Sequence, residues 1–408
     1  MATAALRQPD LESVIDRCAE LMGGTGPDPV AVTAARVLED CAQLDSAGRR
    51  AVYTHLVRDY DVDVSAVREA YRRWEAVVDS GSQGATELTG LFDVVEPARQ
   101  QLLRRLNHAP GGTLALTELR ADVRWMLPEH PDLQPLDHDL LHLLTSWFNR
   151  GFLSVAEVTW ESSSPEVRQH LRQYERVHPM ATPDELRRRI EPSDRRVFAC
   201  FHPATGDVPL IFVEVALCRG VPDRIATLLG PGPALPSEEA DCAVLYSINN
   251  SLAGLAGISF GSMLIKQVIA RVREELPQIT DVVTLSPIPG FRSWLDGHAD
   301  EEAGLRSLRT ALDRWSHTPD GGVEVEAVSP AMVAALRRYL TEEKRPDGQP
   351  LDPVARFHLG NAATVEQLNW PANVSDEAWR QSFGAMVNYR YDARASVDTS
   401  RHEKDSLR

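Results

Sequence analysis

The chain lacks several features that would assign it to a broad class of protein. None of its hydrophobic runs approaches the roughly 20 apolar residues that a membrane-spanning helix needs. Its five cysteines are scattered and odd in number, and none forms a CxxC pair, which favours reduced thiols over a disulfide framework. Its 43 Lys and Arg residues face 59 Asp and Glu residues, for a formal net charge of −16. This balance argues against general nucleic-acid binding but allows a local basic pocket for an anion.

Targeting and metal-binding signals are also weak. The first residues, MATAALRQPDLESV, lack the hydrophobic core of a signal peptide, and the last residues, RHEKDSLR, carry no recognised address. We therefore expect a cytoplasmic protein. His138 and His142 have the i,i+4 spacing of a helical metal pair, but neither a third ligand nor a nearby glutamate pattern accompanies them. Capping or surface roles are the better interpretation, and we predict no metal site.

The length of 408 residues exceeds what one hydrophobic core usually supports, so we expect two domains. Residues 1–175 show apolar residues at helical spacing, including a helix from about residue 85 that stops at HAPGG (108–112). No strand signal of weight precedes about residue 155. We predict a helical N-terminal domain over residues 1–172, of the kind that often carries oligomer contacts, and a second domain over residues 173–408.

The second domain has a different periodicity. Short β-rich runs separated by turn residues predict four strands, at residues 195–201, 208–218, 242–248 and 281–286. Between the last two strands, residues 261–276 place apolar side chains on one helical face. Thr182, Pro183 and Glu185 predict the N-cap, first-turn proline and capping-box glutamate of a helix over 183–190. This order predicts a mixed α/β or α+β domain.

A glycine-bearing turn, NNSLAGLAGISFG (249–261), joins the third strand to the long helix. Backbone amides at such a helix N-terminus can hold phosphate groups, although glycines at a strand-to-helix turn more often serve geometry alone. The turn matches neither a Walker loop nor the Rossmann GxGxxG pattern. By analogy of fold, the order of strand, glycine turn, helix and strand is the one that GNAT (acyl-CoA N-acyltransferase)-like folds use to hold the pyrophosphate of CoA.

Several longer stretches resemble the malonyl-CoA decarboxylase family. They include YSINNSLAGLAGISFGSMLIKQV (246–268), LSPIPGFRSWL (285–295), VARFHLGNAATVEQLNW (354–370) and GAMVNYRYD (384–392), and LLRRLNHAPGGTLAL (102–116) and LLTSWFNRGFLSVAEVTWES (143–162) agree. The resemblance covers roughly residues 85–392 in order. It implies a helical oligomerisation domain, giving a dimer or tetramer, followed by a GNAT-like catalytic domain. The implied reaction converts malonyl-CoA to acetyl-CoA and CO2 in fatty acid metabolism, with no metal or organic cofactor.

The same resemblance implies the site residues. The catalytic serine falls on Ser286, the catalytic histidine on His358 and a supporting tyrosine on Tyr391. The CoA loop falls on Ala256, Gly257, Ile258, Ser259, Phe260, Gly261 and Ser262. Without the family, Ser286 before Pro287 would be a turn residue, and His358 a surface or hydrogen-bonded histidine.

The chemistry of losing CO2 from a malonyl thioester fits these residue types. Backbone amides beside a splayed strand can bind the enolate oxygen, and a serine hydroxyl can orient the carboxylate. A histidine that titrates near neutrality can donate the proton as an imidazolium. We therefore expect Ser286 to handle the carboxylate and proton, and His358 to be the proton donor. Which of the two moves the first proton is open.

One position departs from the family pattern. Ser259 stands where the family loop usually has an acidic residue, so part of the expected hydrogen-bond network is altered. This leaves two alternatives: a decarboxylase or acyltransferase for methylmalonyl-CoA or another acyl-CoA in a biosynthetic pathway, or a CoA-sensing protein with weak catalysis. The presence of Ser286, His358 and Tyr391 together argues against the second alternative.

Overall fold

The computed structural model describes residues 10–24, 28–148, 150–258, 260–317 and 325–392. The chain divides into two compact units. The first comprises residues 1–154, 201–206 and 252–259, and the second comprises residues 155–200, 207–251 and 260–408. Each unit has its own core, and each is described by itself below. The predicted boundary between residues 172 and 173 stays a prediction.

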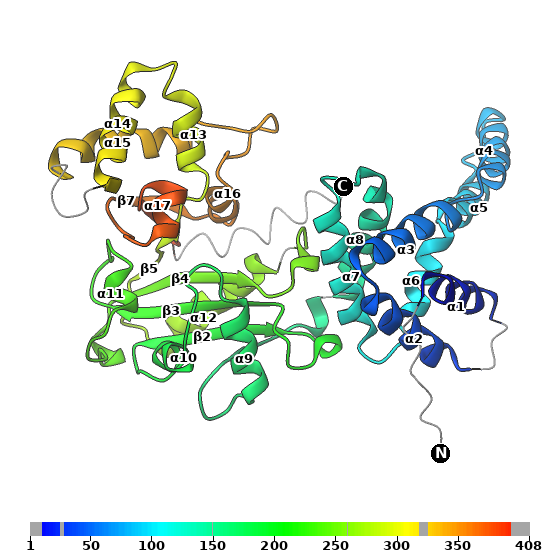
Figure 1. Cartoon of the computed structure of the whole chain (residues 1–408), viewed down its shortest axis with the longest axis horizontal. Helices are drawn as coiled ribbons and strands as arrows, with labels where there is room; N and C mark the ends of the chain where they lie inside the picture. The colour runs from blue at the N-terminus through cyan, green and yellow to red at the C-terminus, as the bar shows by residue number, and fades with distance from the viewer. Residues whose placement is uncertain (1–9, 25–27, 149, 259, 318–324, 393–408) are drawn as a thin grey trace. The chain divides into compact units, whose positions relative to one another are not determined.

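The first unit is built from helices (Figure 1). Several of them begin at an aspartate whose side chain accepts a hydrogen bond from a first-turn amide, as Asp10, Asp45 and Asp63 do. The described helices are α1 (Leu11–Gly23), α2 (Val30–Gln43), α3 (Ser46–Asp59), α4 (Val64–Asp79), α5 (Ala85–Val95), α6 (Ala98–Leu106), α7 (Gly112–Met126) and α8 (Gln134–Trp147), with the 3-10 turns η1 (Pro131–Leu133), η2 (Arg150–Phe152), η3 (Pro203–Thr205) and η5 (Ala253–Leu255).

The predicted long helix ending at residues 108–112 is wrong in one respect. The structure breaks it into α5 and α6, because Pro97 has no N–H to continue the helical bonds. Pro97 also disfavours helical backbone at Glu96, whose ψ of 120° is extended. The core of the unit lies between α1, α2, α3, α6, α7 and α8, where Val14, Leu103 and Leu140 are fully buried.

The second unit surrounds one mixed sheet with the order β1-β2-β3-β4-β5-β8-β6, in which β7 also pairs with β8. The β4–β5 pair is parallel, whereas the β2–β3, β3–β4, β5–β8, β6–β8 and β7–β8 pairs are antiparallel. The strands are β1 (Ser154–Glu157), β2 (Arg195–Phe201), β3 (Ile211–Cys218), β4 (Cys242–Asn250), β5 (Asp281–Thr284), β6 (Ser286–Pro287), β7 (Thr364–Asn369) and β8 (Met386–Arg390).

Some of the described helices of this unit lie by the sheet, whereas those of residues 291–317 and 325–341 form a group of their own (Figure 1). The described helices are α9 (Pro165–Tyr174), α10 (Pro183–Ile190), α11 (Ala226–Leu229), α12 (Gly261–Glu275), α13 (Phe291–His298), α14 (Ala303–His317), α15 (Val325–Thr341), α16 (Pro353–Gly360) and α17 (Asp376–Ser382), with the 3-10 turn η4 (Ser237–Glu239). A cluster on one face of the sheet, including Val244, Val283 and Met386, forms its core there.

The predicted class, a helical domain followed by a mixed α/β domain, is confirmed. The four predicted strands and the helices at 183–190 and 261–276 are all present, with small differences at their ends. At α10, Thr182 Oγ1 accepts the amide of Glu185 as predicted, but the Glu185 carboxylate accepts from the amide of Ala181 instead of that of Thr182.

One difference matters for function. The predicted strand 281–286 ends at Thr284. After Leu285 the pairing with β4 stops while the pairing with β8 continues, so that Ser286 pairs with Val387 of β8.

Candidate active site

Ser286 lies where two parallel strands diverge. The register of β4 with β5 ends at Leu245 and Thr284, and the Leu285 amide makes one more bond, to the Leu245 carbonyl (3.2 Å). Strand β4 then continues to Asn250, whereas Ser286 is no longer paired with β4 and stays paired with β8. Pro287 lacks the N–H that a longer ladder would use. The serine is therefore held at the point of divergence, and only 6% of its surface is exposed.

Thr284 fixes the Ser286 hydroxyl in this structure. Ser286 Oγ donates to Thr284 Oγ1 at 2.9 Å, and the same threonine oxygen accepts the backbone amide of Tyr389 at 3.1 Å. Thr284 and Ser286 are two residues apart, so their side chains lie on one face of the chain. Thr284 is fully buried, which makes its two accepted hydrogen bonds important for the local geometry.

His358 lies in the last turn of α16, a helix whose start is capped by Asp352. The Asp352 carboxylate accepts the amides of Val354 (2.9 Å) and Ala355 (2.8 Å), and Pro353 occupies the first turn. The imidazole stacks on the ring of Tyr389, with centroids 4.7 Å apart and an interplanar angle of 23°. Its exposed fraction is 3%, and this burial lowers the pKa of His358 to about 3.

Tyr391 joins the other side of the imidazole. Its hydroxyl lies 2.8 Å from His358 Nδ1, while His358 Nε2 lies 3.3 Å from Ser286 Oγ. The backbone of Tyr391 is fixed by its amide, which donates to Val282 O, and by its carbonyl, which accepts from Arg273. Burial raises the pKa of the Tyr391 hydroxyl, so this group is a neutral phenol at ordinary pH.

The structure thus brings the three predicted catalytic residues into one hydrogen-bonded chain. Because Ser286 donates to Thr284, its oxygen is free to accept a hydrogen bond from His358 Nε2–H. Nδ1 is then the acceptor of the Tyr391 hydroxyl, and the neutral imidazole carries its proton on Nε2. Every polar atom of the imidazole has a partner in this arrangement, which a buried ring requires.

The predicted CoA loop is divided between the two units. The first unit contains Ala256, Gly257 and Ile258. The second unit resumes with Phe260, Gly261 and Ser262. Ser259 lies outside the described residues. The expectation that Ser259, in place of the usual acidic residue, alters the hydrogen-bond network therefore stays a prediction.

Two glycines of this loop have a structural reason. Gly257 has a φ of +91°, which side-chain-bearing residues rarely adopt. Gly261 is the first residue of α12, and a Cβ there would lie 2.6 Å from Phe357 Cζ, on the residue next to His358.

Sequence reasoning missed Thr284 and Tyr389. Both could have been found from strand alternation, since Thr284 is two residues before Ser286 and Tyr389 is two residues before Tyr391. It also missed Asn388, which points from the opposite side of β8 and donates to the carbonyls of Thr284 (2.8 Å) and Pro222 (3.2 Å). Asn388 is fully buried and ties the end of β5 to β8.

A second buried polar cluster lies elsewhere in the sheet unit. Arg189 of α10 pairs with Glu214 of β3 at 3.0 Å, and Glu214 is 1% exposed. Nearby, Glu175 accepts hydrogen bonds from Ser247 and Asn249 of β4. Burial and the charge of Glu175 both raise the pKa of Glu214, and two carboxylates here share one guanidinium.

Neither a metal cluster nor a membrane-spanning helix is found within the described ranges. His138 and His142 are exposed on α8, and the described residues contain no group of three or more His, Cys, Asp or Glu side chains that could hold a metal ion. None of the described helices is long and apolar enough to cross a membrane.

Comparisons with known proteins agree with this architecture. The family model of the malonyl-CoA decarboxylase C-terminal domain matches residues 151–406, and that of the malonyl-CoA decarboxylase N-terminal domain matches residues 60–148. A mitochondrial malonyl-CoA decarboxylase of Anser anser anser is 32% identical over 401 residues, which cover 90% of this chain and 79% of the goose protein.

Solved structures give the same result over nearly the whole chain. A malonyl-CoA decarboxylase from Rhodopseudomonas palustris is 38% identical, with a TM-score of 0.87 and coverage of 98% of this chain and 97% of that one. A second, from Agrobacterium vitis, is 37% identical, with a TM-score of 0.84 and coverage of 96% and 95%. The chain therefore belongs to the malonyl-CoA decarboxylase family.

Proposed function

We propose that this decarboxylase converts malonyl-CoA to acetyl-CoA and CO2, with Ser286, His358 and Tyr391 as its catalytic residues. Family membership supports the reaction. The observation that carries the site assignment is the continuous chain from the Tyr391 hydroxyl through both imidazole nitrogens to Ser286 Oγ. Such a chain links a proton donor to the place where two strands diverge, and a thioester can enter between diverging strands.

The reaction requires a carbon–carbon bond to break heterolytically. Its electron pair passes to the thioester as an enolate, CO2 leaves, and the former methylene carbon takes up one proton to become the methyl group of acetyl-CoA. We assign stabilisation of the enolate oxygen to backbone amides of β4 beyond Leu245, where the register with β5 has ended. A well-placed donor of this kind is worth roughly 3–4 kcal/mol.

Ser286 would orient the malonyl carboxylate and supply the proton to carbon. When substrate binds, the hydroxyl exchanges its bond to Thr284 for one to the substrate carboxylate. After CO2 leaves, the same hydroxyl faces the carbanion and can donate to it. His358 Nε2–H then restores the serine proton while Nδ1 takes the proton of the Tyr391 hydroxyl, and water returns one proton to Tyr391 to complete the cycle.

The environment of His358 changes one expectation from the sequence. A pKa lowered to about 3 leaves the imidazole neutral at pH 7, so it does not donate as a resident imidazolium. A neutral donor suffices here, because the carbon of a thioester enolate is a stronger base than the alkoxide of serine or the anion of imidazole. The proposed donor is therefore the neutral Nε2–H acting through Ser286 Oγ.

We also propose that the chemistry needs neither a metal nor an organic cofactor, and that the loop Ala256–Ser262 binds CoA. Backbone amides at Gly257 and in the first turn of α12 are suited to phosphate groups, because the first amides of a helix have no intrahelical partner. Extensive treatment with a chelator followed by assay in metal-free buffer should leave the rate unchanged. A loss that added metal restores would contradict this part of the proposal.

One assay tests the function. Purified protein is supplied with malonyl-CoA or methylmalonyl-CoA, and CO2 release and the acyl-CoA product are followed. Turnover of malonyl-CoA with the higher kcat/KM is expected; preference for methylmalonyl-CoA would favour the biosynthetic alternative, and CoA binding without any turnover would favour a sensing role. Ser286→Ala should lower kcat about 100- to 10,000-fold, whereas Ser382→Ala, a buried serine of α17 in the same unit, should not.

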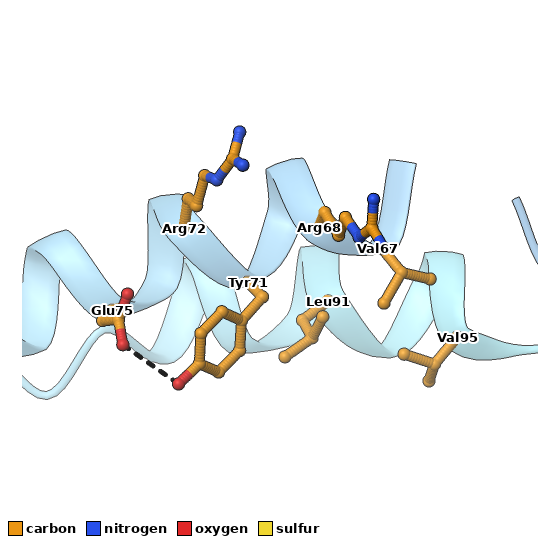
Figure 2. A pocket seen from close by; sticks show the side chains of 7 residues that line it. All are labelled: Val67, Arg68, Tyr71, Arg72, Glu75, Leu91 and Val95. Carbon is orange, nitrogen blue, oxygen red and sulfur yellow. Dashed lines mark hydrogen bonds between the residues drawn. The ribbon is translucent and has the colours of Figure 1, made fainter. Parts of the chain in front are cut away.

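We propose a second copy of the chain as the partner of the hairpin formed by α4 and α5. The hairpin leaves large apolar side chains exposed, including Phe92 at 66%, and α5 has no buried residue. A groove of about 480 Å³ runs along it. Figure 2 shows the side chains that line the groove, among them Arg68 and Tyr71, whose hydroxyl donates to Glu75 (3.0 Å). Acidic and basic side chains lie beside apolar ones on this surface. Such a surface can pair with an identical surface across a two-fold axis, because each charge can then face one of opposite sign.

Light scattering tests this assembly. Wild-type protein should be a dimer or tetramer, and Phe92→Glu should lower its mass toward that of the monomer while kcat at saturating substrate is retained. A monomeric wild type, or an unchanged mass for the variant, would contradict this hairpin interface. The cytoplasmic location also remains a proposal, which fractionation of the source cells would check.

A further inference from the structure

The first half of the predicted CoA loop is held by a buried arginine from the helices. Arg120 of α7 is 1% exposed and is the largest fully buried side chain among the described residues. Its Nε donates to Asp137 Oδ1 of α8 at 2.9 Å. Its Nη1 donates to the backbone carbonyls of Gly254 at 2.6 Å and Ala256 at 2.8 Å. All these residues belong to the same compact unit.

Burying a guanidinium is costly unless its donors are used. Asp137 supplies one acceptor, and the loop carbonyls supply the others. The same unit offers a comparison in Arg99, which is also buried and bonds to Asp139 and Asp61 without reaching the loop. Arg120 therefore does more than form an ion pair in the helical core, because its hydrogen bonds also hold the backbone at Gly254 and Ala256.

The loop backbone also lies directly against α7. A Cβ added at Gly254 would lie 1.8 Å from the carbonyl oxygen of Thr117, one helical turn before Arg120. At Gly257, a Cβ would lie 3.6 Å from Leu141 of α8. Glycine at 254 thus allows a backbone-to-backbone approach, and Arg120 holds the segment there by its carbonyls.

We infer that Arg120 is a positioning residue for CoA binding: it holds the carbonyls of Gly254 and Ala256 so that the amide of the next residue, Gly257, is presented to the CoA phosphates in a fixed arrangement. This rests on the proposed function of the loop. A site that is fixed before the ligand arrives loses less conformational freedom on binding. The helices would therefore contribute to CoA affinity without contacting the reacting atoms.

The test uses the full chain and two readouts. Hydrogen exchange of peptides covering residues 250–262 measures whether the loop is held, and isothermal titration with CoA itself measures affinity without relying on turnover. The variants are Arg120→Ala, Arg120→Lys and the milder Asp137→Asn. The matched control is Arg99→Ala, which also removes a buried arginine paired with an aspartate.

Arg120→Ala should speed exchange of the loop amides and raise the Kd for CoA by about tenfold or more, the size expected for losing hydrogen bonds from a charged donor. Arg120→Lys, which keeps one donor group, should lie between it and wild type. Arg99→Ala should leave both quantities within about twofold even where its melting temperature falls, because its partners lie outside the loop.

Three results would overturn the inference. Unchanged loop exchange in Arg120→Ala would show that the arginine does not hold the loop. Faster loop exchange with an unchanged Kd would show that holding it does not matter for CoA. Equal effects in Arg99→Ala would reduce the role of Arg120 to stability of the helical unit.

A separate pair of variants covers the case in which Arg120→Ala does not fold. Gly254→Ala must displace the loop from Thr117, whereas Gly232→Ala has no atom within 4 Å of the new Cβ. Only the former should raise the Kd for CoA. A wild type that binds no CoA would refute the proposed function, and the loop exchange would still decide whether Arg120 holds the segment.

Discussion

The neutral state of His358 gives a sharp prediction about the pH dependence of stability. Its pKa is lowered from 6.5 to about 3 in the folded chain because the ring is buried. Between these values the unfolded chain binds the proton and the folded chain does not. Stability is therefore lost as the pH falls below about 6.5, by about 1.4 kcal/mol per pH unit, until the folded pKa is reached.

The magnitude follows from the two pKa values. Between pH 7 and pH 5, this single group should lower the free energy of unfolding by about 2 kcal/mol. His358→Gln has no such titration, so its stability should fall by about 2 kcal/mol less than that of wild type over the same interval. His178, whose pKa burial also lowers to about 4, is present in both proteins and cancels in the comparison.

Urea unfolding at both pH values, followed by tryptophan fluorescence and circular dichroism, provides the measurement. If the two units unfold separately, the comparison uses the transition that the variant shifts. Equal losses in the two proteins, within about 0.5 kcal/mol, would refute the reasoning. His358 would then be protonated in the folded chain, and an imidazolium donor would return as the better mechanism.

Three other substitutions test neighbouring parts of the argument. Tyr391→Phe removes the donor to Nδ1 and should lower kcat about 10- to 100-fold with little change in KM; steady-state kinetics at the wild-type rate would contradict the tautomer assignment. Gly261→Ala overlaps the phenyl ring of α16 and should cost about 1–3 kcal/mol of stability in urea unfolding, whereas Gly360→Ala meets no atom within 4 Å and should cost far less. Arg189→Ala leaves buried carboxylates without their cation and should lower the free energy of unfolding by about 3–5 kcal/mol. Glu214→Gln should lower it much less, because Glu175 still balances the guanidinium. Equal losses in the two variants would contradict a charge shared by both carboxylates.

Much of the sheet unit could be predicted from the sequence because its local signals agree. The run at Arg195–Phe201 is β-rich and bounded by turn residues, and β2 has those same ends. The helix at 183–190 follows from a threonine cap, a first-turn proline and a glutamate three residues after the cap. By contrast, the strongly helical pattern on both sides of Pro97 predicts one helix, whereas the structure has two, and the proline is the stop signal that separates them.

The candidate site was predictable only in part, because its key contacts are long-range. Ser286 and His358 are 72 residues apart, and no local periodicity shows that they meet. After Leu285 the chain loses β4 as a partner and keeps β8, which depends on where β8 lies in the sheet and is a property of the whole fold. The low pKa of His358 arises from burial beneath Tyr389, so a reference value from the free residue was misleading.

The division of the chain between its two units has a consequence for dissecting the protein. The chain passes from one unit to the other after residues 154, 200, 206, 251 and 259. No single cut therefore separates them, and a fragment that starts at residue 155 would carry two segments stripped of the helices with which they pack. Recombination that exchanged whole N-terminal domains between distant relatives would have to preserve those two short segments as well, so the two halves are constrained to change together.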